Sequence, residues 1–391
     1  REVYRGFGCM VVDESEPYLD QPLGYIALEA AWTSLFGETL YACRLLAILL
    51  SAVDAALIYL IARRLFSNRL GFLAGLSFAL APPVVIQTYQ AFLDHGVIFW
   101  SLLSLYALLK HLDSPSTPKL MASSVCAGLA AYSKTTGLAA VGMVFLLLAL
   151  EHRYRDAIIA AAVGLAIFSI YPITGLLLHR ELFLTVMKAY SYQIWYPGYV
   201  RMLEFMFECG GFSIADDVNS WLDPYMLIAW IGVSAIAMYE RNRARYVMVP
   251  LACFVLMLLM RGSGNHTGVL SWYLMSLFPW LSMGYGYAMD RALSEPWFGF
   301  QYVVFNTPAL LRLIAVFFPG CYAIQWAVYS PMYWVRMALV AVVGGLLLLC
   351  AASYVLYKRV VWAAATYGLV AAVFLCYLCL LYTSPSPRDR G

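Results

Sequence analysis

Charged residues are scarce in this chain of 391 residues: Asp, Glu, Lys and Arg make up 12% of it, whereas hydrophobic residues make up 63%. Soluble domains contain about 25% charged residues, so the composition excludes a water-soluble globular protein. A helix that spans a bilayer needs about 20 mostly apolar residues, and the apolar runs of this chain are long enough for about a dozen such helices. The sequence therefore predicts an all-α polytopic membrane protein.

The chain also lacks the sequence motifs of nucleotide-binding and zinc enzymes. It has no Walker loop, dinucleotide fingerprint or HExxH motif, and no pattern supports a divalent metal. The net charge of +3 is too small to indicate a nucleic-acid partner. Most of the nine cysteines lie within apolar runs, where we expect them to pack as small hydrophobic side chains.

The apolar runs predict where the spans lie and which loops share a side of the membrane. The spans are expected near residues 42–62, 70–88, 96–110, 120–133, 137–150, 157–178, 226–239, 247–260, 268–287, 309–328, 334–356 and 360–381. If the first span runs inward, more than half of the 25 basic residues fall in inside loops. This distribution satisfies the positive-inside rule, so we expect an integral protein of a prokaryotic plasma membrane in contact with its lipids.

Two long segments are predicted to lie on the outer face, residues 1–41 and 179–225. Most acidic residues fall on this face, although acidic residues do little to set topology. We therefore expect the chemistry of the protein on the exterior side, within a single membrane domain over residues 1–381. Residues 382–391 resemble a translated adapter sequence, and a first residue of Arg rather than Met predicts N-terminal truncation.

Three candidate site segments lie at the predicted outer ends of the spans. Asp94 and His95 place a carboxylate beside an imidazole at a membrane boundary, where a carboxylate usually faces a cavity, although Asp94 would also suit a helix N-cap. Lys134 occupies a tight outer turn, where Lys is least expected; the alternative is a structural Lys whose side chain extends towards water. Asp20 and Gln21 precede an amphipathic run, which is also consistent with a membrane-surface helix that has Pro22 in its first turn.

Asp54 lies in the middle of the first predicted span. An ionisable residue inside a membrane span is by default a candidate for function. We interpret it instead as a structural residue that forms a hydrogen bond to a neighbouring helix.

Several short motifs, taken in order, resemble the amino-terminal half of the GT-C membrane glycosyltransferases. The closest patterns are those of the protein O-mannosyltransferases and the aminoarabinose transferases of lipid A. The motifs are Asp20-Gln21-Pro22-Leu23, Leu35-Phe36-Gly37, Arg44-Leu45, Ala62-Arg63-Arg64-Leu65-Phe66, Ala91-Phe92-Leu93-Asp94-His95 and Lys134-Thr135-Thr136-Gly137. The resemblance covers about residues 1–180, and beyond them Trp272-Tyr273 is similar to an Arg-Tyr element of the family but lacks the Arg.

The resemblance implies a function and a set of site residues. Family members transfer a sugar from a polyprenyl-phosphate carrier to a lipid, glycan or protein acceptor on the outer face. The resemblance therefore implies a lipid-linked sugar as the donor substrate, and it implies no further cofactor. By this resemblance Asp94, Asp20 and His95 are predicted to be catalytic. Substrate binding is assigned to Lys134, which would hold the phosphate, and to three further residues, Gln21, Arg44 and Tyr273. The acidic motif of the family that carries its main catalytic carboxylate is expected upstream of Arg1.

A secondary transporter or flippase is the rival interpretation, because midplane charges would then serve as ion sites. Only Asp54 lies deep in a span, and the chain has no paired broken segments or internal repeat of the kind that transporters show. The sequence therefore favours an inverting glycosyltransferase over a transporter.

Overall fold

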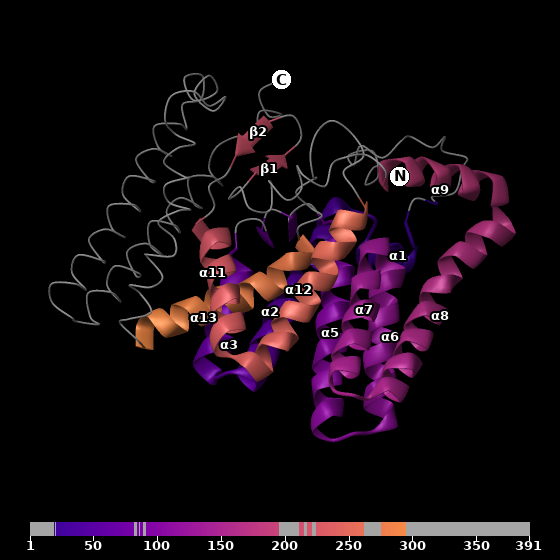
Figure 1. Cartoon of the computed structure of the whole chain (residues 1–391). Helices are drawn as coiled ribbons and strands as arrows, with labels where there is room; N and C mark the ends of the chain where they lie inside the picture. The colour runs from indigo at the N-terminus through magenta and orange to yellow at the C-terminus, as the bar shows by residue number, and fades with distance from the viewer. Residues whose placement is uncertain are drawn as a thin grey trace. The chain divides into compact units, whose positions relative to one another are not determined.

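The computed structural model describes residues 19, 21–81, 84–85, 87–88, 91–194, 211–214, 217–220, 224–261 and 275–294. The chain divides into two compact units, residues 1–287 and 288–391. The described part is mostly helical, as Figure 1 shows, and this confirms the predicted all-α fold. Its helices begin with α1 (Gly24–Phe36), α2 (Leu40–Leu65), α3 (Asn68–Leu80), α5 (Asp94–Asp113) and α6 (Thr117–Ser133).

A short 3-10 helix, η1 (Thr135–Gly137), connects α6 to α7 (Leu138–Leu150), and α8 (Tyr154–Leu178) and α9 (Arg180–Ile194) follow. The predicted outer segment 179–225 also contains an antiparallel hairpin of two strands, β1 (Gly211–Ile214) and β2 (Asp217–Ser220), with Gly211 opposite Ser220. The remaining helices are α11 (Pro224–Tyr239), α12 (Arg241–Arg261) and α13 (Phe278–Ser294).

Local sequence signals explain several helix boundaries. The side chains of Thr39 and Ser67 accept hydrogen bonds from the backbone N–H groups of Ala42 and Leu70, and so cap the starts of α2 and α3. The predicted span 70–88 ends earlier than expected, because α3 stops at Leu80. Ala81 is extended, with φ −62° and ψ 120°, as sterically required of a residue that precedes a proline.

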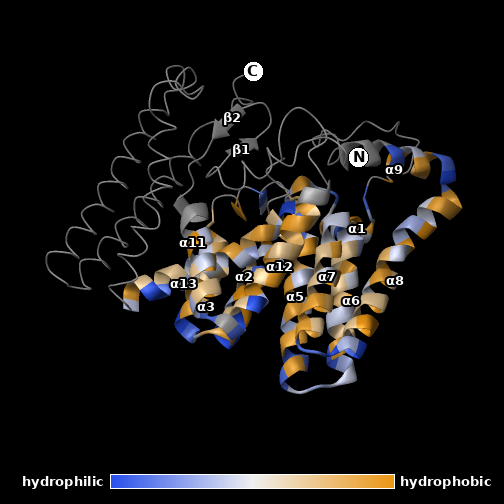
Figure 2. Ribbon diagram, viewed as in Figure 1, coloured by the Kyte–Doolittle hydropathy of each residue, from blue (hydrophilic) through white to orange (hydrophobic). Residues whose placement is uncertain are grey.

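Three helices in the described ranges are long and apolar enough to cross a membrane: α2, α5 and α8. Hydrophobic residues run along these helices in Figure 2, and hydrophilic residues gather at the turns that join α2 to α3 and α5 to α6. The predicted spans 309–328, 334–356 and 360–381 lie outside the described residues. The complete set of about a dozen spans and the single domain over residues 1–381 therefore stay predictions.

The long helices pack on one another so that α5 lies between α2 and α6, while α6 and α7 both contact α8. Ion pairs join one end of this assembly: Arg64 to Asp113, Arg153 to Asp156 at 2.5 Å, and Arg245 to Glu151 at 2.7 Å. All six residues lie in or beside loops that the sequence predicts on the inner side; the pairs of Arg64 with Asp113 and of Arg245 with Glu151 connect different loops, whereas Arg153 and Asp156 lie in the same one. Because α5 begins at Asp94 and ends at Asp113, Asp94 lies at the opposite end of the same helix.

Candidate functional site

A buried ion pair lies at the end of the helices opposite to that ion-pair network. Lys134 Nζ donates a hydrogen bond to Asp94 Oδ2 over 2.6 Å, and the two side chains are 5% and 2% exposed. The chain positions the pair through the α5–α6 hairpin, because Asp94 is the first residue of α5 and Lys134 immediately follows the last residue of α6. The sequence analysis selected Asp94 and Lys134 as separate candidates, and the structure brings their side chains together as an ion pair.

The carboxylate of Asp94 does not cap its helix. The N-cap residue of α5 is Leu93, without a capping side chain, and Asp94 Oδ1 is buried without a hydrogen-bond partner among the described residues. The alternative of a helix N-cap is therefore wrong. An unpartnered carboxylate oxygen next to a fixed ammonium group remains available to accept a proton from a bound molecule.

Gln21 joins this site through the turn that carries Lys134. Its Oε1 accepts hydrogen bonds from the hydroxyl of Thr135 at 3.3 Å and from the backbone N–H of the same residue at 3.5 Å. Gln21 is buried and precedes α1, which begins at Gly24. Pro22 therefore lies before the helix and not within its first turn as predicted. The sequence analysis included Thr135 in a family motif, but it did not predict the contact with Gln21, which is 114 residues away.

Close packing at two glycines brings α1 onto α5 and α6. A Cβ atom at Gly96 would lie 2.6 Å from Tyr25 Cδ2 and 3.0 Å from Ser133 Oγ, and one at Gly24 would lie 2.6 Å from the carbonyl oxygen of Tyr132. Real Cβ atoms do not approach other atoms this closely, so glycine is required at both positions for the elements to meet. The glycine at position 96, two residues after Asp94, is the feature of the sequence that could have predicted the close approach of α1 to α5.

The other predicted site residues have different surroundings. His95 is buried, and neither ring nitrogen has a hydrogen-bond partner of ordinary geometry within the described ranges, although the backbone of Gln87 approaches the ring. Arg44 lies half-buried in the second turn of α2, the helix that packs against α1 and α5. Asp20 and Tyr273 lie outside the described residues, so their predicted roles stay predictions.

A second group of buried polar side chains lies between α1 and α2. Burial raises the pKa of the Glu29 carboxyl, and a hydrogen bond with the Cys43 side chain partly opposes this effect. Burial also raises the pKa of the Tyr25 hydroxyl, which lacks a hydrogen-bond partner in the described part of the chain. Asp54 is fully buried, and neither of its carboxylate oxygens forms a hydrogen bond to a described residue. Among the described residues, the hydrogen bond that was predicted from Asp54 to a neighbouring helix does not form.

No group of three or more His, Cys, Asp or Glu side chains that could hold a metal ion occurs among the described residues. The pair of Asp94 and Lys134 instead combines a proton acceptor with a cation. An ammonium group has three N–H donors and no acceptor, and Lys is a common ligand of phosphate. The arrangement suits a reaction in which a hydroxyl or amine loses a proton while a phosphate departs.

Residues 20–174 match the family described as Dolichyl-phosphate-mannose-protein mannosyltransferase. Over 114 residues the chain is 32% identical to the Undecaprenyl phosphate-alpha-4-amino-4-deoxy-L-arabinose arabinosyl transferase of Pseudomonas aeruginosa (strain UCBPP-PA14). This alignment covers 29% of the chain and 21% of that protein. The chain therefore matches only about a fifth of the length of this curated relative.

Two crystal structures of ArnT from Cupriavidus metallidurans have a similar fold. The apo structure gives a TM-score of 0.56 at 17% identity, over 96% of this chain and 68% of that one. The structure bound to undecaprenyl phosphate gives a TM-score of 0.54 at 18% identity, and the match covers 92% of this chain and 66% of the ArnT chain. The shared fold and the match over residues 20–174 together confirm the predicted resemblance of this chain to the GT-C membrane glycosyltransferases.

Proposed function

We propose that the chain transfers a sugar from a polyprenyl-phosphate-linked donor to a lipid, glycan or protein acceptor. The observation that carries the proposal is the buried pair of Asp94 and Lys134 beside Gln21, at one end of α5 and α6. The names of the matched proteins support the class of donor. The relative from Pseudomonas aeruginosa is described as an arabinosyl transferase with an undecaprenyl phosphate sugar, and one ArnT structure contains undecaprenyl phosphate.

The proposed reaction needs little help at its leaving group, because a lipid-linked phosphate departs as a stable anion. It does need a base for the acceptor and positive charge near the departing phosphate. In this proposal Asp94 Oδ1 takes the proton of the acceptor group while the acceptor atom bonds to the anomeric carbon. The bond from that carbon to the phosphate oxygen breaks at the same time, with inversion of configuration, by analogy with inverting glycosidases.

Lys134 has two tasks in this proposal. Its hydrogen bond to Asp94 Oδ2 orients the buried carboxylate so that Oδ1 faces the acceptor group. Its positive charge also stabilises the departing phosphate, for which Lys acts as a point charge. Gln21 and Arg44 are assigned to the substrate, and Asp20, His95 and Tyr273 keep the roles that the resemblance implies.

We place the site on the exterior face of a prokaryotic plasma membrane, because the loops at the other end of the helices carry the basic residues. This orientation predicts that a cysteine in place of Asp217 reacts with a membrane-impermeant maleimide in intact cells. A cysteine in place of Arg63 should react only after the membrane is opened, and it serves as the matched control. Labelling of position 63 but not 217 in intact cells would reverse the topology.

Incubation of the full-length protein in lipid nanodiscs with a radiolabelled polyprenyl-phosphate sugar and an extract of envelope lipids and glycans tests the function. We expect acceptor-dependent transfer of the label.

The burial of Asp54 is the observation that favours the rival function of a transporter or flippase, because Asp54 is a fully buried acidic residue inside a span. Movement of the lipid-linked sugar across vesicles without transfer of the label would establish that alternative.

A further inference from the structure

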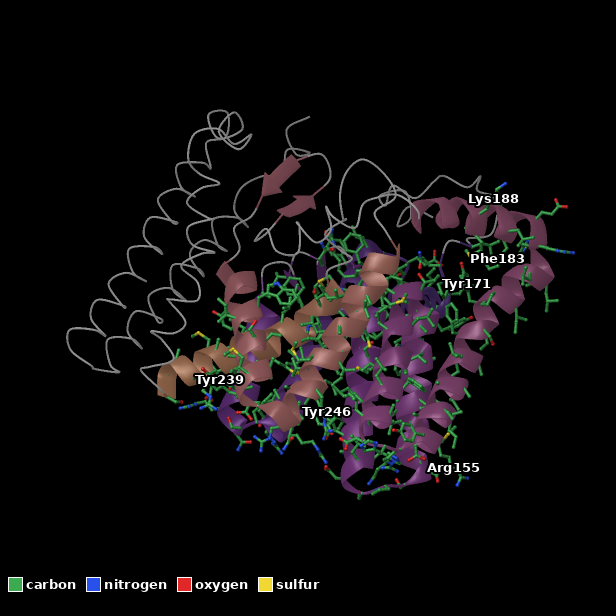
Figure 3. The ribbon with its side chains drawn as sticks, in the orientation of Figure 1. Arg155, Tyr171, Phe183, Lys188, Tyr239 and Tyr246 are labelled. Carbon is green, nitrogen blue, oxygen red and sulfur yellow. The ribbon has the colours of Figure 1, made fainter. Side chains whose placement is uncertain are left out.

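An aromatic cluster connects α8 and α9 to the segment that carries Gln21. The hydroxyl of Tyr171, in the last third of α8, donates a hydrogen bond to the backbone carbonyl of Leu19 over 2.7 Å. Both residues are buried, and Leu19 packs in the same cluster as Tyr171 and Phe183. Figure 3 shows Tyr171 and Phe183 on neighbouring parts of α8 and α9.

The ring of Tyr171 is held by its neighbours on several helices. It meets Phe183 edge to face, with ring centroids 5.5 Å apart and an interplanar angle of 77°, and it lies 6.2 Å from the ring of Phe168. Tyr132 of α6 packs against the same cluster. Gly175 lets Phe183 approach, because a Cβ atom there would lie 2.3 Å from Phe183 Cδ2. The hydroxyl of Tyr171 therefore has a fixed position from which to hold Leu19.

The segment that follows Leu19 is attached to the site at two further points. Gln21 accepts hydrogen bonds from Thr135, the residue after Lys134, and Gly24 lies against the backbone of Tyr132 near the end of α6. Leu19 is the attachment on the α8 side, and removal of the Tyr171 hydroxyl would take away the hydrogen bond that its carbonyl accepts within the described residues. An unpaired buried carbonyl is unfavourable, so the segment would shift towards water.

We propose that Tyr171 is a positioning residue, whose hydrogen bond to the Leu19 carbonyl fixes Gln21 relative to the pair of Asp94 and Lys134. The proposal rests on the function proposed above. Tyr171 acts on the reaction through the backbone of Leu19 and the side chain of Gln21. Small displacements of a group that orients substrate lower reaction rates strongly, so loss of one hydroxyl far from the reacting atoms should reduce transfer.

Tyr171→Phe tests this proposal, because it removes the hydroxyl and keeps the aromatic packing. The matched control is Tyr154→Phe at the opposite end of α8, where the hydroxyl contacts only the exposed side chain of His152 in the described part of the chain. Each variant is made in the full chain and again with Leu19→Cys. Maleimide reactivity at position 19 is located by peptide mass spectrometry, because the chain has nine native cysteines.

We expect Tyr171→Phe to raise the labelling rate of Cys at position 19 by roughly fivefold to tenfold, the effect of losing one hydrogen bond. We also expect kcat/KM for the lipid-linked donor to fall about tenfold, mainly through KM. Tyr154→Phe should change neither quantity, and the melting temperatures of the two variants should agree closely.

The two readouts separate failure of this inference from failure of the proposed function. Unchanged labelling at position 19 in Tyr171→Phe would overturn the inference, whatever the transfer assay gives. Faster labelling with an unchanged kcat/KM in an active protein would also overturn it and leave the proposed function standing. A wild-type protein that transfers no sugar would refute the proposed function, whereas faster labelling in that protein would still support Tyr171 as the residue that holds the segment.

Discussion

Replacement of Asp94 by Asn should lower the rate of sugar transfer by roughly 10² to 10⁴, the usual contribution of a general base. The change keeps the shape of the side chain, and the amide oxygen can still accept the hydrogen bond that Lys134 Nζ donates to Oδ2. It removes the negative charge and the basic lone pairs on the unpartnered Oδ1. Initial rates at saturating donor, measured on protein of equal folded fraction, give the effect on kcat.

The same substitution removes the negative charge of Asp94 from its place beside the buried ammonium of Lys134, so lower stability must be separated from lost chemistry. Removal of one partner from a buried ion pair costs about 3–5 kcal/mol, whereas replacement of both partners is often neutral. The double variant Asp94→Asn with Lys134→Met should therefore regain most of the lost stability but keep the low residual turnover of Asp94→Asn. Wild-type turnover in Asp94→Asn would remove Asp94 from the list of catalytic residues.

Lys134→Met should be the more destabilising of the two single substitutions, because Met cannot donate a hydrogen bond to the buried carboxylate, whereas Asn at position 94 still accepts one from Lys134. We expect a loss of about 3–5 kcal/mol in the free energy of unfolding, together with a raised KM for the lipid-linked donor. Lys134→Arg keeps the positive charge and should retain partial activity, but its planar guanidinium differs from a point charge in geometry. Chemical denaturation and titration of the donor measure the two effects.

The double-mutant cycle also decides between the two tasks of Lys134. If Lys134 acts solely by orienting Asp94, its removal should have no further effect on donor dependence once Asp94 is Asn. If it also stabilises the phosphate, Lys134→Met should still raise the KM for the donor in the Asp94→Asn background. A Lys134→Met protein with wild-type stability and donor dependence would mean that the side chain simply extends towards water.

Local sequence patterns predicted most helices in the first half of the chain because their causes lie within a few residues. Apolar runs of the length of a bilayer gave α2, α5 and α8 nearly to their ends. The turn at Lys134 was also predicted, and it forms as a 3-10 helix between α6 and α7. The apolar run placed the end of α3 several residues too late, because Pro82 restricts Ala81 to an extended conformation and ends the helix at Leu80.

The sequence by itself determined that this is a helical membrane protein, that its basic loops gather at one end, and that Asp94 and Lys134 lie at the other. Each of these conclusions depends on the composition or period of a short stretch. Only the tertiary structure decided that Lys134 pairs with Asp94 across 40 residues, that Tyr171 holds Leu19 across 152 residues, and that Asp54 has no hydrogen bond to a described residue. Such contacts depend on how separate helices pack together, and no local pattern in one helix encodes the side chain it will meet on another.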